Sequence, residues 1–186
     1  MNLRQLPNLI TGVRMLLVLP LMWSLRDGDY DWSLVIALAA GGSDAVDGWL
    51  AKRYRWQTRL GGLLDPVADK LLLVASFVGL WLAGASPGWL TALVIGRDVV
   101  IVAGAVVYNA VVGPVDANPT LLSKVTTVAQ IGLVLALLVG LAWRPLPVDV
   151  SIGSIWLVAA LTFVSGIDYV VRWSLLAHRE LRARRR

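Results

Sequence analysis

The sequence contains no cysteine and one histidine among its 186 residues. The absence of cysteine excludes disulfides, thiolate metal sites and a cysteine nucleophile. His178 lies in a basic segment near the C-terminal end, and we interpret it as a solvated side chain and not as a catalyst. No internal repeat is found, and only the arginine-rich end is of low complexity. A repeat array is therefore not expected.

Hydrophobic residues, by contrast, make up 58% of the chain, and the mean hydropathy is +0.72. Apolar runs of about 20 residues, the length that crosses a bilayer, recur along the whole sequence. The first run lacks a small-residue cleavage site and five more follow it, so we expect a membrane span there and not a removable signal. We predict an all-α integral membrane protein, one domain over 1–186 with a short basic tail at 177–186. Its six transmembrane helices are expected at 8–25, 32–51, 65–83, 89–112, 120–143 and 150–176.

The net charge of +5 comes largely from two basic segments. One is the loop at 52–59 and the other is the arginine-rich C-terminal end. The positive-inside rule predicts that both termini and this loop lie in the cytoplasm, as in a multi-pass protein of an inner (plasma) membrane, and anionic membrane lipids are expected around the basic segments. Nucleic acid is not an expected partner, because no aromatic platform accompanies the charge. Tryptophans expected at the membrane interface stand near span ends, at Trp23, Trp32, Trp81, Trp89 and Trp143.

Four aspartates flank the basic loop. Asp44 and Asp47 are three residues apart near the end of the second predicted span, and Asp65 and Asp69 are four apart at the start of the third, so each pair shares a helical face. A hairpin would bring all four carboxylates together at the cytoplasmic membrane surface, where cations must neutralise them. Oxygen ligands favour Mg²⁺ or Mn²⁺, and two such ions about 3.5–4 Å apart support displacement at phosphorus. The alternative for Asp44 and Asp47 is an ordinary solvated pair at a helix end.

Small residues lie next to these aspartates. Gly48 and Ala51 leave little side-chain bulk on the second span, so a nucleotide base or a pyrophosphate could lie against the backbone. Gly61 is expected in a loop that approaches closely from the other side. Both Gly48 and Ala51 could instead serve helix packing. Asp65 precedes Pro66, which predicts that Asp65 also caps the third helix.

This pattern resembles a known signature. The segment reads Asp44-x-x-Asp47-Gly48-x-x-Ala51-Lys52, then eight residues, then Gly61-x-x-x-Asp65-x-x-x-Asp69. It is similar to the signature of the CDP-alcohol phosphotransferase (CDP-alcohol phosphatidyltransferase) family, which comprises six-helix membrane enzymes that commonly dimerise. Membership implies a homodimer, two divalent metal ions (Mg²⁺ or Mn²⁺) and CDP-diacylglycerol as the phosphatidyl donor. Lys52 departs from the family's usual arginine, which keeps the charge but loses bidentate geometry.

The resemblance also implies residue roles. Asp44, Asp47 and Asp65 would hold the metals, and Asp69 would bind metal and act as the general base that deprotonates the acceptor hydroxyl. Arg14, in the first span, could join the substrate contacts or pair with a carboxylate. Residues expected to contact the CDP-linked lipid are Asn8, Thr11, Gly48, Ala51, Lys52, Thr58 and Gly61.

Further charges within the predicted spans bear on the acceptor alcohol. Arg97 and Lys124 exceed the charge that Asp98 can neutralise, so we expect at least one of them to bind an anionic acceptor. A mutual salt bridge inside the bundle, among Arg97, Asp98 and Lys124, is the alternative. Glycerol 3-phosphate, phosphatidylglycerol, an inositol phosphate and serine remain possible acceptors.

The runs 95–99 and 119–130 resemble those of CDP-alcohol-type cardiolipin synthases, whose acceptor is phosphatidylglycerol. Phosphatidylglycerophosphate synthases, which use glycerol 3-phosphate, are the alternative, but they tend to carry a second lysine where this chain has Thr126. A remote alternative is an ion or metal transporter, since intramembrane carboxylates also mark ion paths. A transporter would distribute its charges through the depth of the bilayer, whereas the acidic residues here are expected on one side.

Overall fold

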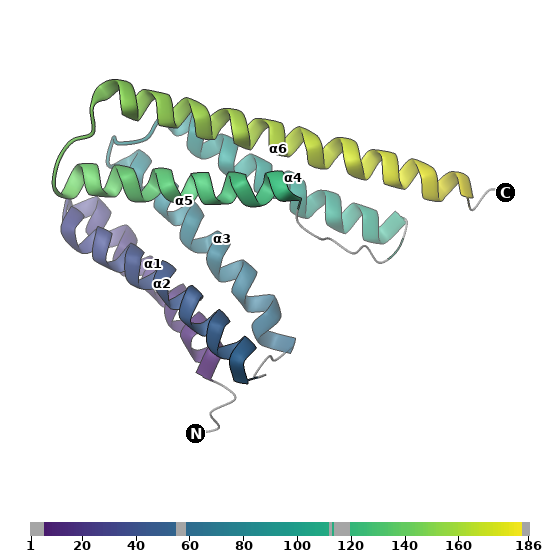
Figure 1. Cartoon of the computed structure of the whole chain (residues 1–186), viewed down its shortest axis with the longest axis horizontal. Coiled ribbons are helices and arrows are strands. Elements are labelled where there is room, and N and C mark those ends of the chain that lie inside the picture. Colours follow the sequence, from purple (N-terminus) through teal and green to yellow (C-terminus); the bar gives the residue numbers. More distant parts are fainter. Residues whose placement is uncertain (1–5, 55–58, 112, 114–119, 184–186) are drawn as a thin grey trace. The chain divides into compact units, whose positions relative to one another are not determined.

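The computed structural model describes the backbone of residues 6–54, 59–111, 113 and 120–183 (Figure 1). Within these ranges, the side chains of residues 6–8, 44–54, 59–64, 111, 177, 179, 181 and 183 are not described. The described chain is all-helical and contains six helices. They are α1 (Leu6–Asp27), α2 (Tyr30–Tyr54), α3 (Arg59–Leu82), α4 (Gly88–Val111), α5 (Leu121–Ala142) and α6 (Val148–Ala183). Each predicted span corresponds to one of them.

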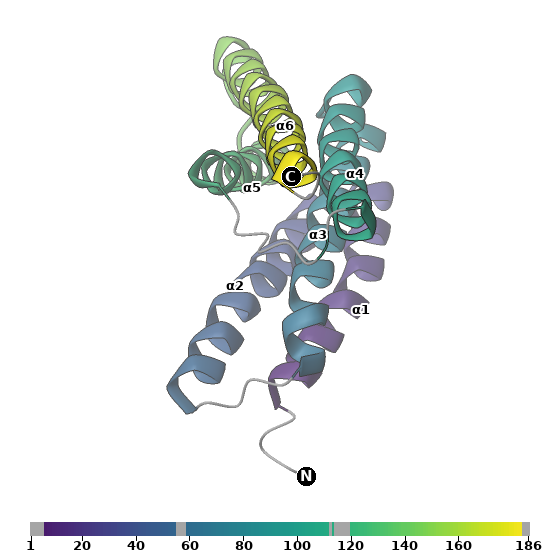
Figure 2. The ribbon, with the colours of Figure 1, turned by 90° about the vertical axis from the view of Figure 1, so that its right-hand side faces the viewer.

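The helices form two compact units. The first comprises Met1–Pro87 and Val134–Pro147, and the second comprises Gly88–Leu133 and Val148–Arg186. In the first unit α1 packs against both α2 and α3, as the two ribbon views show (Figure 2). The buried positions of α1 recur every three or four residues, which is the spacing of one helical face. They are Thr11, Arg14, Val18, Leu21 and Leu25.

Close packing of α1 on α3 depends on Gly79. A Cβ atom at this position would collide with the Cδ1 end of the Leu25 side chain. Gly28 and Gly84 serve a different purpose, since their φ angles of +80° and +75° place them in the left-handed region that follows many helix ends. After Gly28, the Asp29 amide donates to the carbonyl of Ser24 at 2.9 Å, which ends α1 and starts the turn into α2.

In the second unit α4 packs along α6. Aromatic side chains mark this contact: the rings of Trp89 and Trp156 have centroids 5.1 Å apart, and those of Tyr108 and Trp173 are 6.0 Å apart. Gly104 lies under Trp173, because a Cβ there would be 3.1 Å from the indole ring. α5 joins α6 through polar contacts, including a 3.0 Å hydrogen bond from the amide of Gln130 to the hydroxyl of Thr162.

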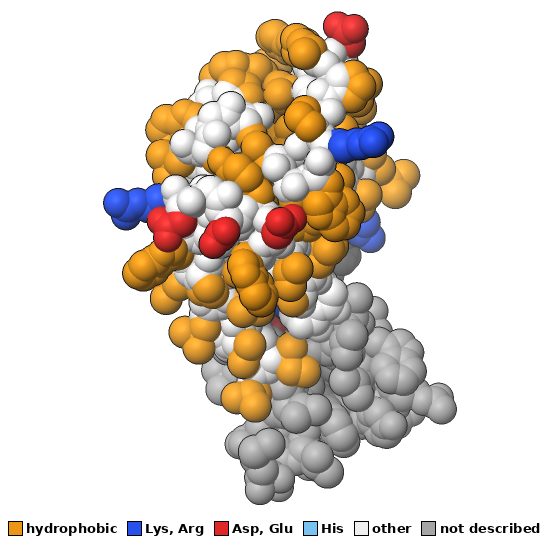
Figure 3. Space-filling view, turned by 90° about the vertical axis from the view of Figure 1, so that its left-hand side faces the viewer, with side chains coloured by type: hydrophobic (Ala, Val, Ile, Leu, Met, Phe, Trp, Pro, Cys, Tyr) orange, Lys and Arg blue, Asp and Glu red, His pale blue; other side chains and the backbone are white. Residues whose placement is uncertain are grey.

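Apolar side chains cover the described helices on the outside. On α1 the exposed residues include Leu9, Val13, Leu16 and Leu19, opposite its buried face. The face drawn in Figure 3 shows hydrophobic side chains with few charged ones among them. Four stretches of the described helices are long and apolar enough to cross a membrane: Leu9–Asp27, Gly88–Ala110, Leu121–Ala142 and Val148–Leu176. An apolar exterior around buried polar side chains is the arrangement that a lipid environment favours. The tryptophans predicted at the interface are all exposed and lie near helix ends: Trp23, Trp32, Trp81, Trp89 and Trp143.

Two helix boundaries differ from the prediction by more than three residues. α3 begins at Arg59, so Asp65 and Pro66 lie inside the helix. The expectation that Asp65 is a helix cap was wrong, as was the placement of Gly61 in a loop. Pro66 is exposed, and α3 continues through it, because the backbone group that a proline frees in an apolar helix can be satisfied locally. α6 continues to Ala183, beyond the predicted end of the span at 176, because its last residues are mostly strong helix formers.

Candidate active site between α1, α2 and α3

Two side chains of α1 contact two aspartates of α3. The hydroxyl of Thr11 donates a hydrogen bond to Oδ1 of Asp65 at 2.5 Å. One turn further along α1, Nη1 of Arg14 donates to Oδ1 of Asp69, also at 2.5 Å. The donors are three residues apart and the acceptors four apart, so each pair lies on a single helical face. The two helices therefore align a pair of donors with a pair of carboxylates.

Burial differs across these contacts. The side chain of Arg14 is 0% exposed, whereas that of Asp69 is 49% exposed. Thr11 is fully buried and Asp65 is partly buried. The donors thus belong to the interior of the first unit, and the carboxylates stand at its edge. A carboxylate has two oxygens and can accept several partners at once, so a bond from Arg14 is compatible with a further ligand on Asp69.

The second predicted pair lies on α2. Asp44 and Asp47 both fall within its continuous helix, so their spacing places them on one face, while their side chains lie outside the described residues. Asp47 is seven residues before the last residue of α2, and Asp65 is six residues after the first residue of α3. At about 1.5 Å per residue, both stand roughly 10 Å from the short connection between these helices. Among the described side chains no group of three candidate metal ligands gathers, but Asp44 and Asp47 are not among those side chains.

Most predicted CDP-lipid contacts also fall where the structure describes only the backbone. These are Asn8 on α1, Gly48, Ala51 and Lys52 on α2, and Gly61 on α3. Thr58 lies outside the described residues altogether. Thr11 is the predicted contact whose side chain is described, and it contacts Asp65. Arg14, for which a substrate contact and a carboxylate partner were both open, has a carboxylate partner.

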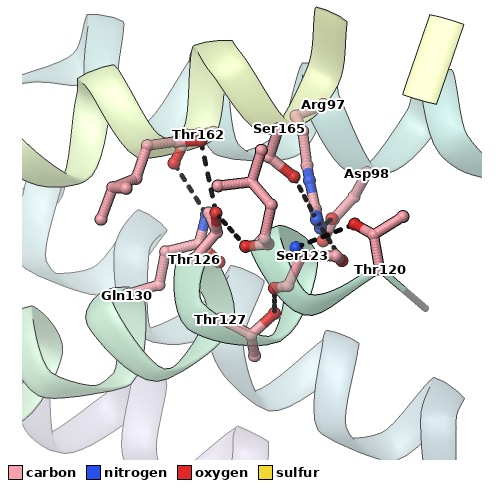
Figure 4. Close-up of polar contacts among 11 residues, drawn as sticks. Arg97, Asp98, Thr120, Ser123, Thr126, Thr127, Gln130, Thr162 and Ser165 are labelled. Carbon is pink, nitrogen blue, oxygen red and sulfur yellow. Dashed lines mark hydrogen bonds and ion pairs between the residues drawn. The ribbon is translucent and has the colours of Figure 1, made fainter. Parts of the chain in front are cut away.

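Arg97 occupies the interior of the second unit (Figure 4). Its Nη1 donates to Oδ1 of Asp98 at 2.8 Å, and its Nη2 donates to the hydroxyls of Ser123 and Ser165 at 2.6 and 2.9 Å. The guanidinium carbon also lies 5.9 Å from the ring centroid of Tyr169, within the range of a cation–π contact. Of the mutual salt bridge that was the alternative to acceptor binding, the part between Arg97 and Asp98 is therefore present, whereas Lys124 is exposed. Arg97 joins α4, α5 and α6 through one buried side chain.

Lys124 and Thr126 lie on different faces of α5. Lys124 is exposed, and Thr126 is fully buried. The hydroxyl of Thr126 donates to the carbonyl of Leu122 at 2.8 Å and lies 3.3 Å from the carbonyl of Leu161 on α6. Position 126 is thus part of the contact between α5 and α6 that Figure 4 shows.

Ser165 and Tyr169 contact Arg97, but sequence reasoning did not identify them. The available signal was a polar residue inside an apolar run, four residues before an aromatic one. A serine in a membrane helix often bonds its own backbone. This signal therefore does not distinguish such a serine from one that bonds a distant arginine.

A chain of apolar helices that encloses polar side chains and carries paired aspartates near a helix connection defines a multi-pass membrane protein with an acidic site. Comparison with known families identifies which one. The model of the CDP-alcohol phosphatidyltransferase family matches residues 4–165. The chain belongs to this family, whose members are enzymes and use divalent metal ions. The match includes both aspartate pairs, Arg14 and Arg97.

Curated relatives carry two kinds of name. The chain is 28% identical over 186 residues to a probable cardiolipin synthase (CMP-forming) of Drosophila melanogaster, covering 91% of this chain and 58% of that protein. It is 30% identical over 182 residues to a probable phosphatidylglycerophosphate synthase of Mycobacterium tuberculosis, covering 92% and 82%. It is 31% identical over 189 residues to the CDP-diacylglycerol–glycerol-3-phosphate 3-phosphatidyltransferase of Bacillus subtilis, covering 92% and 96%. The match therefore spans 58% of the fly protein, 82% of the Mycobacterium protein and 96% of the Bacillus protein.

Proposed function

We propose that this protein transfers a phosphatidyl group from CDP-diacylglycerol to an anionic alcohol and releases CMP. The observation that carries the proposal is the alignment of Thr11 and Arg14 with Asp65 and Asp69. It orders two of the signature carboxylates at the edge of the first unit. A transporter is not favoured, because an ordered acidic pair in a family of transferases needs no ion path to explain it.

The residues of the first unit fit two divalent cations, since their donors are hard carboxylate oxygens and Asp69 is half exposed. Asp44, Asp47, Asp65 and Asp69 would hold the ions, whose contribution is to stabilise charge on the oxygens around phosphorus. Asp69 would accept the proton of the acceptor hydroxyl. The hydroxyl oxygen would then form a bond to the lipid-side phosphorus as the bond from that phosphorus to the CMP oxygen breaks.

The donor would lie along the same three helices. By the family signature, Gly48, Ala51 and Lys52 of α2 and Gly61 of α3 would contact the CDP-linked lipid, together with Thr58. Asn8 and Thr11 would contribute from α1. The contact between Thr11 and Asp65 supports an indirect role for Thr11, through the orientation of a ligand carboxylate.

For the acceptor we favour phosphatidylglycerol, which makes the protein a cardiolipin synthase. Buried Thr126 supports this choice, because it stands where the glycerol 3-phosphate enzymes tend to carry a second lysine. Phosphatidylglycerol also carries less negative charge than glycerol 3-phosphate and so needs fewer cations. Phosphatidylglycerophosphate synthase is the second candidate, supported by the Mycobacterium and Bacillus relatives. Of the two predicted acceptor residues, exposed Lys124 is the stronger, since Arg97 has three polar partners within the unit.

We further propose six membrane spans with both termini and the 52–59 loop in the cytoplasm, and an active site at the cytoplasmic surface of an inner membrane. The basic loop supports this orientation through the positive-inside rule. A homodimer is proposed from the family alone. Cysteines introduced one at a time on either side, in this cysteine-free chain, would report the orientation by their labelling with an impermeant reagent.

The deciding experiment gives the purified protein CDP-diacylglycerol, Mg²⁺ or Mn²⁺, and either phosphatidylglycerol or glycerol 3-phosphate. Mass spectrometry identifies the lipid product, and CMP release is followed in parallel. Cardiolipin with stoichiometric CMP is the expected result. Phosphatidylglycerophosphate would replace the first candidate with the second, and an absence of CMP release with every alcohol tested would overturn the proposed activity.

A further inference from the structure

Arg14 carries a charge on the interior face of an apolar helix. It lies within Leu9–Asp27, a stretch that is long and apolar enough to cross a membrane, and its side chain is 0% exposed. A charged side chain within a span costs about 2.5–3.5 kcal/mol on insertion scales, so a residue of this kind usually serves a function. A leucine in its place would complete the buried stripe of α1 formed by Val18, Leu21 and Leu25.

The position of Arg14 is tied to that of Asp69. Its Nη1 lies 2.5 Å from Oδ1 of Asp69, which is 55 residues further along the chain and belongs to α3. Arginine–carboxylate bonds are charge-assisted and directional, and they fix the rotamer of both partners. The same face of α1 bonds the neighbouring carboxylate through Thr11, one turn away. Two bonds one turn apart set the register of α1 along α3 as well as the orientation of each carboxylate.

We propose that Arg14 is a positioning residue, which holds the Asp69 carboxylate in the orientation that catalysis requires and does not itself contact substrate. This inference rests on the proposed function of Asp69. Burial supports it, since a fully buried guanidinium beside a half-exposed carboxylate acts through that carboxylate. Partners that orient the ligands of a metal site typically contribute about 10–100-fold in affinity or activity.

The first test separates positioning from substrate binding by kinetics. Arg14→Met keeps most of the apolar stem and removes the guanidinium. We expect kcat to fall by about 10–100-fold, with the KM for CDP-diacylglycerol changed by no more than about twofold. Arg14→Lys should recover part of the loss, since it retains a cation. Arg172→Met is the matched control, because it removes an arginine from an exposed pair with Asp168 on α6, and it should leave kcat unchanged. A raised KM with unchanged kcat would show instead that Arg14 binds the donor.

The second test does not depend on turnover. A double-mutant cycle of Arg14→Met and Asp69→Asn is measured by thermal unfolding in detergent with a chelator present, so that metal binding does not contribute. We expect Asp69→Asn to lower Tm more than Arg14→Met does, since the guanidinium of Arg14 stays buried while it loses the charge of the Asp69 carboxylate. The double variant should have a higher Tm than Asp69→Asn alone. Additive changes in Tm would overturn the inference even for an active enzyme.

The two failures are distinguishable. If the wild-type protein releases no CMP but the cycle shows coupling, the proposed activity is wrong and the Arg14–Asp69 pair stands as a structural contact. If the wild-type protein is active but Arg14→Met and Arg14→Lys both retain full kcat, the positioning role is wrong and the proposed activity stands. Should Arg14→Met fail to fold, Arg14→Lys replaces it in both tests. Its kcat is then compared with that of the wild-type protein, and its Tm with that of Asp69→Asn.

Discussion

The hydroxyl of Thr11 donates a 2.5 Å hydrogen bond to Oδ1 of Asp65, 54 residues further along the chain. Thr11 is fully buried, so its hydroxyl reaches the carboxylate from the interior of the first unit. The sequence pattern predicted a contact between Thr11 and the nucleotide-linked lipid. The observed contact favours a different role, in which Thr11 orients a carboxylate that would bind metal, and the two roles lead to different kinetics.

Thr11→Val removes the hydroxyl and nearly preserves the shape of the side chain. We expect it to reduce kcat by about tenfold or more, because Asp65 loses the bond that orients it. Thr11→Ser, which retains the hydroxyl, should stay close to wild type. Steady-state kinetics with CDP-diacylglycerol varied checks this. An increase in the KM for CDP-diacylglycerol with unchanged kcat would instead support the direct substrate contact that the family resemblance predicted.

Asp69→Asn should abolish turnover, while the variant should still bind the CDP-linked lipid nearly as well as the wild-type protein does. The amide keeps the size of the carboxylate but cannot accept the acceptor proton as a base. Binding is measured by the Tm increase that CDP-diacylglycerol causes in the variant and in the wild-type protein. Asp168→Asn, a carboxylate on α6 that pairs with Arg172, is the control and should retain activity. Full activity of Asp69→Asn would mean that the four aspartates are structural.

Removal of divalent metal should stop the reaction reversibly. Asp65 and Asp69 of α3 supply hard oxygen ligands. A chelator should therefore be able to remove the ions that they hold. We expect EDTA to abolish CMP release and Mg²⁺ or Mn²⁺ to restore it, whereas Zn²⁺ should restore less. Activity that persists through extended chelation would contradict the metal assignment.

The helices could be predicted from the sequence because apolar runs of bilayer length leave few alternatives. The paired spacing of Asp65 and Asp69 likewise predicted a shared face, and both lie in one helix. The start of α3 could not be predicted, because Gly61 and Pro66 are local breaking signals and yet the helix continues through both.

The partners of the buried charges were harder to predict. Arg14 and Asp69 are 55 residues apart, and the local sequence around each residue does not identify the other as its partner. The pair Arg97 and Asp98 was open to prediction because its members are adjacent, whereas Ser165, 68 residues from Arg97, was not. Long-range pairing depends on the rotation of one helix against another, which periodicity alone leaves undetermined.

Arg97 and Lys124 should respond to substitution in opposite ways. Arg97 is 5% exposed and bonds Asp98, Ser123 and Ser165. Arg97→Met removes one partner of a buried ion pair, so we expect a loss of about 3–5 kcal/mol of stability, seen as a lower Tm. The double variant Arg97→Met with Asp98→Leu should recover part of it, since the carboxylate that loses its bond to Arg97 is then also removed.

Lys124 is exposed on α5, and Lys124→Met should leave Tm unchanged. If Lys124 binds the anionic acceptor, the same variant should raise the KM for phosphatidylglycerol by about tenfold, the equivalent of roughly 1.4 kcal/mol, with the KM for CDP-diacylglycerol unaffected. Lys124→Arg, which retains the charge, is the matched control. If the KM for phosphatidylglycerol is unchanged in Lys124→Met but raised in a folded Arg97 variant, Arg97 and not Lys124 binds the acceptor.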